Sequence, residues 1–142
     1  MAQSAHRFAL DLRFGDFDSA GIVYFPRYLH YCHVGMEEYF GAVVGLPYAT
    51  LVGERRLGLP TVRSECEHHR PIRYGERIEL EVEVTRVGST SVEWRHRFRR
   101  SGDSRPLSEC RVVTVLVDMG SFEKRAVPDW LRDALLGAAP RG

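Results

Sequence analysis

The sequence has no long apolar run, almost no net charge and few cysteines, and each shortage excludes a class of protein. Its apolar stretches are short, whereas a membrane-spanning helix needs about 20 residues, so we expect no contact with a membrane. Twenty Lys and Arg against nineteen Asp and Glu leave a formal charge of +1, too even for a surface that gathers nucleic acid. The N-terminal segment lacks the apolar core of a signal peptide, so the expected compartment is the cytoplasm.

Three cysteines, Cys32, Cys66 and Cys110, form an odd set without a CxxC pair. This argues against a disulfide framework and against a zinc ribbon, so we expect all three to be reduced. The other composition values are ordinary, with 44% hydrophobic and 27% charged residues in 142. They indicate one globular domain over residues 1–142, with a frayed tail at about 137–142.

Hydrophobic periodicity predicts the order of the elements. Apolar residues alternate with polar ones over 7–14, which is typical of a half-buried strand with Phe8, Leu10, Leu12 and Phe14 on its buried face. From Arg27 the apolar spacing becomes helical, and Pro26 and Gly45 suit the two ends of a helix of roughly eighteen residues. The apolar stripe of this helix is predicted to be Leu29, Cys32, Met36, Phe40 and Val43. Further strands are expected at about 61–71, 76–87, 90–100 and 106–118, and short helices within 47–56 and 127–136.

This order predicts an α+β fold in which helix and sheet are segregated. Short connections between consecutive strands favour an antiparallel meander. A five-stranded antiparallel sheet wrapped around one long central helix is the hot-dog architecture. One helix leaves a sheet edge and part of a face uncovered, so we expect at least a dimer.

The loop between the first strand and the long helix carries the strongest local signal. It places Asp18 a few residues ahead of a helix start, where backbone N–H groups lack intrahelical partners and attract negative charge. Asp16 and Asp18 could equally close an Asx-turn or cap the helix, and the spacing alone does not decide between these roles.

The segment Gly15-Asp-Phe-Asp-Ser-Ala-Gly-Ile-Val-Tyr-Phe-Pro-Arg-Tyr28 resembles the motif of the 4-hydroxybenzoyl-CoA thioesterase family of hot-dog proteins. The likeness continues at Leu59-Pro-Thr-Val62, Pro71-Ile-Arg-Tyr-Gly75 and Ser91-Val-Glu-Trp-Arg-His96, and so covers almost the whole chain. It implies hydrolysis of an acyl-CoA by a homo-oligomer, either a homodimer or a dimer of dimers. It also implies no metal and no cofactor, because CoA is part of the substrate.

The resemblance assigns roles to residues of the loop. Asp18 matches the catalytic carboxylate, acting as nucleophile or as general base, and Asp16 is its structural partner. The backbone N–H of Phe25 is implied to form the oxyanion hole. Tyr24 and Phe25 would line the acyl pocket, although an aromatic pair beside a helix start is about as often part of a core.

The resemblance also indicates which residues bind the nucleotide end of CoA and which class of acyl group the protein prefers. Thr90 and Ser91, together with Lys124 and Arg125, are expected to contact the phosphate end of CoA. Phe25 stands where many short-chain relatives have histidine, which favours an aryl-CoA such as 4-hydroxybenzoyl-CoA or benzoyl-CoA. A short or medium acyl-CoA is the other possibility, and a carrier-protein thioester is left open.

Two other functions compete with this interpretation. A hot-dog hydratase or dehydratase would use a catalytic histidine with an acidic partner, which His30 or His33 with Glu37 could imitate, but the intact GDxDxxG loop argues against it. The same three side chains have metal-ligand spacing, although a polar helix face is the commoner explanation. The second competing function is not enzymatic: a module that binds acyl-CoA without hydrolysing it. A basic run at 95–100 suggests nucleic acid, but strand alternation divides it between two faces.

Overall fold

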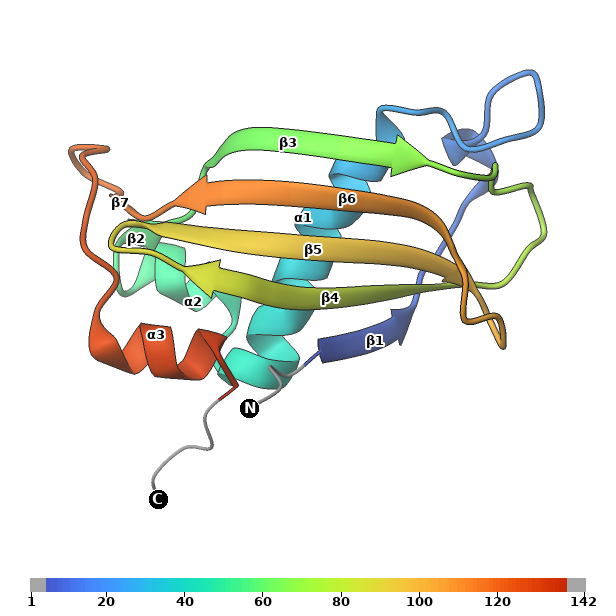
Figure 1. Ribbon diagram of the computed structural model, residues 1–142. Helices are drawn as coiled ribbons and strands as arrows, with labels where there is room; N and C mark the ends of the chain where they lie inside the picture. The colour runs from blue at the N-terminus through green and yellow to red at the C-terminus, as the bar shows by residue number, and fades with distance from the viewer. Residues whose placement is uncertain (1–4, 138–142) are drawn as a thin grey trace.

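The main sheet of the protein has five antiparallel strands in the order β1-β4-β5-β6-β3, with a long helix across one face (Figure 1). The computed structural model describes residues 5–137. The strands are β1 (Ala5–Ala9), β3 (Thr61–His68), β4 (Ile78–Val87), β5 (Ser91–Arg100) and β6 (Pro106–Val115). The predicted strand 106–118 is interrupted at Leu116 and forms two strands, β6 and β7 (Val117–Asp118). β7 pairs with β2 (Leu57–Gly58) in a small separate ladder. The predicted five-stranded α+β hot-dog fold is confirmed.

The long helix begins at Arg27, as predicted, and changes character near its end. Its α-helical part is α1 (Arg27–Tyr39), and it continues as a π-helical segment, η2 (Phe40–Val44), which ends at Gly45 with φ of 78°. Cys32, Met36 and Phe40 of the predicted apolar stripe are buried, but Leu29 is 48% exposed. Leu29 was wrongly assigned to the core because the helix turns a different set of residues toward the sheet: Tyr28, Tyr31, Gly35 and Tyr39.

Short helices close the structure at one end of the sheet. They are α2 (Tyr48–Gly53) and α3 (Asp129–Leu135), and both lie within their predicted ranges. α3 buries Leu131 and Leu135, and the Tyr39 hydroxyl donates a hydrogen bond of 2.6 Å to the Leu135 carbonyl. The predicted tail lies, apart from Gly137, outside the described residues. Within the part of the chain that the structure describes, no helix is both long and apolar enough to cross a bilayer.

The first strand is shorter than predicted. The β1–β4 ladder ends where Ala9 pairs with Glu79, and one more hydrogen bond joins the Leu10 N–H to the Ile78 carbonyl. The chain then leaves the sheet for a 3-10 turn, η1 (Phe14–Asp16). Phe14 is therefore 78% exposed instead of buried, because it no longer belongs to the sheet.

The expectation of three reduced cysteines is wrong for two of them. Cys66 on β3 and Cys110 on β6 are direct partners in the strand register, with Cα atoms 4.1 Å apart, and they form a disulfide. Cysteine counting missed this pair because only strand register brings the two residues together. Cys32 is free and buried, and burial raises the pKa of its thiol to about 12.

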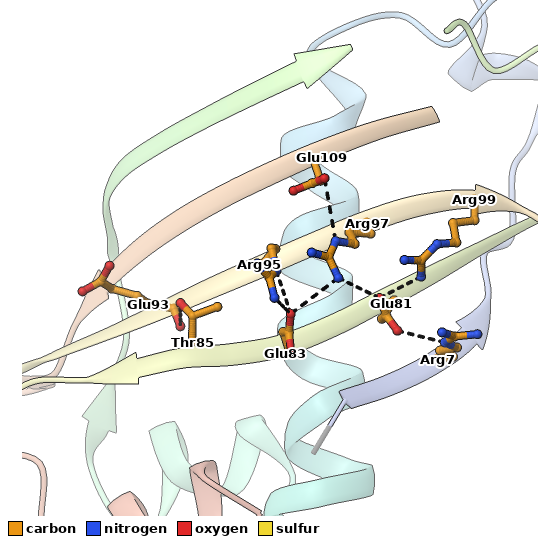
Figure 2. Close-up of polar contacts among 9 residues, drawn as sticks. All are labelled: Arg7, Glu81, Glu83, Thr85, Glu93, Arg95, Arg97, Arg99 and Glu109. Atoms are coloured by element: carbon orange, nitrogen blue, oxygen red, sulfur yellow. Dashed lines mark hydrogen bonds and ion pairs between the residues drawn. The ribbon is translucent and has the colours of Figure 1, made fainter. Parts of the chain in front are cut away.

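The outer face of the sheet carries paired charges (Figure 2). Arg95, Arg97 and Arg99 project from β5 on this face, while His96 and Phe98 between them are buried under α1. Arg99 Nη1 lies 2.7 Å from Glu81 Oε1, and Arg95 pairs with Glu83. The basic run at 95–100 is thus divided between the two faces, as alternation predicts, and its outer arginines are neutralised by glutamates.

Candidate active site

The loop that carries Asp18 is shaped by its own backbone hydrogen bonds. The Asp18 N–H donates to the Ile22 carbonyl at 2.9 Å, and the Gly21 N–H donates to the Asp18 carbonyl at 3.0 Å. Gly21 has φ of 80°, a conformation that glycine adopts without steric cost. Asp18 Oδ1 accepts the Ala20 N–H at 2.8 Å, so the residue closes an Asx-turn. The carboxylate remains exposed to solvent, and its orientation is fixed.

Asp16 anchors the loop. Its Oδ2 accepts the Arg13 N–H at 3.1 Å, and its Oδ1 lies 3.6 Å from Arg27 Nε. Its carbonyl accepts the Tyr24 N–H at 2.9 Å. These contacts join the turn before Asp18 to the first residue of α1.

The start of α1 presents a free backbone donor. Arg27 donates to the Tyr24 carbonyl at 2.9 Å and Tyr28 to the Phe25 carbonyl at 3.2 Å, while Pro26 has no N–H. Among the described residues, no acceptor takes the N–H of Phe25. A free N–H at a helix start, where the helix dipole adds partial positive charge, can stabilise a developing oxyanion.

Tyr24 and Phe25 do not belong to the core. Tyr24 is 49% exposed and Phe25 is 70% exposed, and their ring centroids lie 5.6 Å apart. Because both rings are exposed, Tyr24 and Phe25 are not core residues. A role in lining the acyl pocket stays a prediction.

A cavity of about 380 Å³ opens beside Phe25, between the start of α1 and the end of β3. Tyr28 and His68 form two of its walls, with ring centroids 4.4 Å apart. His68 Nδ1 lies 2.9 Å from Ser108 Oγ, and burial lowers the pKa of His68, which favours its neutral form. Sequence analysis missed His68 because only the strand pairing carries this residue to the helix start.

The predicted nucleotide contacts come together at the far end of the sheet. The Leu116 N–H donates to the Thr90 carbonyl at 2.7 Å, and the Arg125 N–H donates to the Leu116 carbonyl at 2.9 Å. Ser91 begins β5, and Lys124 forms a bridge with Val117. The loop of Asp18 and the β4–β5 turn lie at opposite ends of the sheet (Figure 1). Since β5 spans ten residues, these ends are roughly 30 Å apart, so one chain does not unite the two groups.

The rival histidines do not form a buried catalytic pair. His33 Nε2 lies 3.8 Å from Glu37 Oε1, and both side chains are more than half exposed. Such an exposed pair is typical of a solvated helix face. No cluster of three or more His, Cys, Asp or Glu suited to a metal ion occurs between residues 5 and 137.

Known proteins share this fold and part of the sequence. Residues 12–135 match the family described as the thioesterase-like superfamily. A 1,4-dihydroxy-2-naphthoyl-CoA hydrolase of Synechococcus elongatus is 29% identical over 131 residues, which cover 92% of this chain and 94% of that protein. A Pseudomonas aeruginosa protein of solved structure has a TM-score of 0.82 at 27% identity, covering 96% of this chain and 94% of its own. A gentisyl-coenzyme A thioesterase has a TM-score of 0.79 at 22% identity, covering 93% and 99%.

The family match spans most of the chain, from residue 12, just after β1, to the end of α3. It includes the Asp18 loop, the start of α1 and the whole β3–β6 part of the sheet. The narrower resemblance to 4-hydroxybenzoyl-CoA thioesterases remains a prediction. The chain belongs to the thioesterase-like superfamily.

Proposed function

We propose that this protein hydrolyses an aryl-CoA thioester to the free acid and CoA, with Asp18 as the catalytic carboxylate. The observation that carries the proposal is the oriented, exposed Asp18 carboxylate in the loop that leads to the free N–H of Phe25. The relatives named above support thioester hydrolysis, and two of their names specify aromatic acyl groups. The favoured substrates are 4-hydroxybenzoyl-CoA and benzoyl-CoA, with short or medium acyl-CoA as the alternative.

Two routes use the same groups. In the first, an Asp18 oxygen attacks the thioester carbon, the C–S bond breaks with its electron pair leaving on sulfur, and water hydrolyses the mixed anhydride. In the second, Asp18 takes a proton from the water that attacks the carbon, and the C–S bond then breaks with its electron pair leaving on sulfur. In both routes the carbonyl oxygen becomes negative, and the Phe25 N–H stabilises that charge.

The site is proposed to be composite, with two chains contributing to each centre. β3 is an edge strand whose residues Thr61 to Glu65 are all exposed, and Val62 is 61% exposed. A two-fold axis at this edge pairs β3 with its copy in antiparallel fashion. The far end of one sheet then lies beside the Asp18 end of the other. Thr90, Ser91, Lys124 and Arg125 of the partner subunit would thereby hold the nucleotide of a thioester bound at Asp18.

The first experiment measures release of CoA thiol from 4-hydroxybenzoyl-, benzoyl-, acetyl-, hexanoyl- and palmitoyl-CoA. Asp18→Asn is expected to lower kcat by about 10²–10⁴-fold, because an amide is neither a base nor a good nucleophile. Glu37→Gln is the matched control and is expected to retain activity, whereas a hydratase built on His33 and Glu37 would lose it. Near-normal kcat in Asp18→Asn would overturn the mechanism. Binding of CoA esters without turnover by the wild-type protein would instead favour the non-catalytic module.

A further inference from the structure

A second cavity, of about 190 Å³, lies between the middle of α1 and the inner face of the sheet. Its walls include Leu29, Cys32, Met36, Trp94, His96 and Val112, and the exposed side chains of His33, Thr61 and Ser64 also line it. The half-exposed Leu29 lies at the side of the cavity that is nearest along α1 to Phe25. Leu29 follows Phe25 by about one helical turn, or ~5.4 Å. Phe25 itself lines the larger cavity described above, so an acyl group whose carbonyl meets the Phe25 N–H would pass Leu29 to enter this space.

His96 is the unusual member of the lining. Its side chain is 1% exposed and faces α1 from the middle of β5, between Trp94 and Phe98, which are also buried. Neither ring nitrogen makes a hydrogen bond with any described residue. Nδ1 is enclosed against Gly35 of α1, which leaves Nε2 as the ring nitrogen for a ligand in the cavity. Leaving such a group unpaired in the interior costs about 1–3 kcal/mol. A polar group without a protein partner in a cavity wall is suited to a polar group of a ligand.

The other enclosed polar groups of the cavity have partners or are weak. Thr114 Oγ1 accepts the Trp94 Nε1–H at 3.0 Å and donates to the Val92 carbonyl at 3.0 Å. Cys32 contributes a protonated thiol, a weak donor. Burial lowers the pKa of His96 to about 3, so the imidazole is neutral near pH 7 and offers one N–H donor and one acceptor. A neutral imidazole of this kind pairs with a hydroxyl group and gives no charge to hold a carboxylate.

The volume limits what enters. A dry apolar cavity of about 150 Å³ is large enough to bind benzene. The space here is slightly larger, so it matches one substituted aromatic ring more closely than a fused pair of rings. Its apolar lining, with the Trp94 ring in one wall, matches an aromatic face.

We propose that this cavity is the binding site for a single aromatic ring bearing a hydroxyl group, and that His96 recognises the hydroxyl. The inference rests on the proposed function and deepens it, since it places the acyl ring of a monocyclic hydroxyaryl thioester in this space. His96 is then a specificity-determining residue, while Asp18 and the Phe25 N–H act at the thioester.

Tryptophan fluorescence tests the site without any catalysis. The chain has two tryptophans, and Trp130 is 41% exposed beside Arg55, so Trp130→Phe leaves Trp94 as the reporter. The probes are phenol and toluene, which have nearly the same shape, and 2-naphthol as the two-ring comparison. Phenol is expected to change the Trp94 emission saturably, and 2-naphthol is not. No saturable change with phenol, or equal binding of 2-naphthol, would overturn the proposal.

Substitution of His96 tests recognition of the hydroxyl. In His96→Leu, which keeps a similar volume, the ratio of toluene Kd to phenol Kd is expected to fall about tenfold. Cys32→Leu reduces the cavity from the opposite wall and should weaken both probes without changing their ratio. This second variant keeps the test decisive if His96→Leu fails to fold. His30→Leu, an exposed position on α1 outside this cavity, is the matched control and should bind as the parent does.

A steady-state kinetic experiment distinguishes failure of this inference from failure of the proposed function. The ratio of kcat/KM for 4-hydroxybenzoyl-CoA over benzoyl-CoA is expected to fall about tenfold in His96→Leu. An unchanged ratio with active enzyme would overturn the His96 assignment and leave thioester hydrolysis intact. Probe binding that depends on His96, without hydrolysis of any thioester, would overturn the proposed function and support the cavity as a site.

Discussion

Gly35 on α1 packs directly against His96 on β5. A Cβ atom at position 35 would lie 3.0 Å from His96 Nδ1 and 2.8 Å from Val82 Cγ2, both closer than ordinary contact. The absence of a side chain at Gly35 therefore lets the helix approach the sheet beside the cavity. The depth of the cavity and the burial of His96 both depend on this contact.

Gly35→Ala is expected to destabilise the protein by about 1–3 kcal/mol, because the added methyl group overpacks this contact. Urea unfolding followed by circular dichroism measures the change. Gly41→Ala is the matched control on the same long helix, since its Cβ would have no neighbour within 4 Å. Its stability should be unchanged or higher, because alanine favours helix over glycine. Equal stability of the two variants would contradict the close approach at Gly35.

The disulfide between Cys66 and Cys110 links residues 44 positions apart and fastens the edge strand β3 to β6. Loop-closure entropy predicts a stabilisation of about 4 kcal/mol for this separation. Dithiothreitol should therefore lower the urea midpoint of the wild-type protein. The double variant Cys66→Ala/Cys110→Ala should be insensitive to the reductant. A wild-type midpoint that does not respond to the reductant would refute the stabilising role.

Cys32 should be inert in the folded protein. Burial raises the pKa of its thiol to about 12, so the reactive thiolate is scarce at pH 8. A chromogenic disulfide reagent is expected to detect no thiol in the native state and a single thiol per chain after unfolding without reductant. Rapid labelling of the native protein would contradict the buried position, and three thiols in the unfolded, unreduced protein would contradict the disulfide.

Glu81 should make stability depend on pH. Burial opposes its charge, but hydrogen bonds from Arg99 and Arg7 outweigh burial, so the pKa of Glu81 lies below its usual value. The contribution of the Glu81 carboxylate to the free energy of unfolding is complete above its unfolded-state pKa of about 4.3. It is lost as the pH falls through the lower folded-state pKa. Glu81→Gln is expected to cost about 1.5–3 kcal/mol at pH 7 and progressively less below pH 4.

The measurement is the free energy of unfolding in urea at several pH values. Glu79→Gln serves as the control, because Glu79 is on the same strand and outer face and has no ion pair with any described residue. Its effect should be small at every pH. A cost for Glu81→Gln that stays constant from pH 7 to pH 3 would refute the linkage.

A composite site predicts complementation between two inactive variants. In a mixed dimer, one chain carries Asp18→Asn and the other carries Lys124→Ala/Arg125→Ala. One active site then contains all of the substituted residues, and the other contains only wild-type residues. Co-expression with two affinity tags isolates the mixed dimer, and about half of the wild-type activity is expected. Sites confined to one chain would leave no intact centre, so a mixed dimer as inactive as its parents would refute the composite arrangement.

Residue spacing alone determined much of the architecture. The period-two alternation of β4 and β5 and the helical spacing after Pro26 are local properties, so they predicted the sheet, the eighteen-residue helix and its end at Gly45. The loop before the helix start also singled out Asp18 as a candidate. The catalytic role of Asp18 and the oxyanion role of the Phe25 N–H came instead from the resemblance of the segment from Gly15 to Tyr28 to a family motif. In that range the interactions that shape the backbone connect residues close in sequence.

Tertiary structure decided the rest, because it depends on pairings between distant segments. Strand register joined Cys66 to Cys110 and brought His68 to the start of α1. The rotation of the helix on the sheet exposed Leu29 and enclosed His96 beside Gly35. The length of the sheet separated the loop that carries Asp18 from the segment after β7 that carries Lys124 and Arg125 (Figure 1). None of these relationships is encoded in local periodicity, since each is set by how two faces pack and where two strands align.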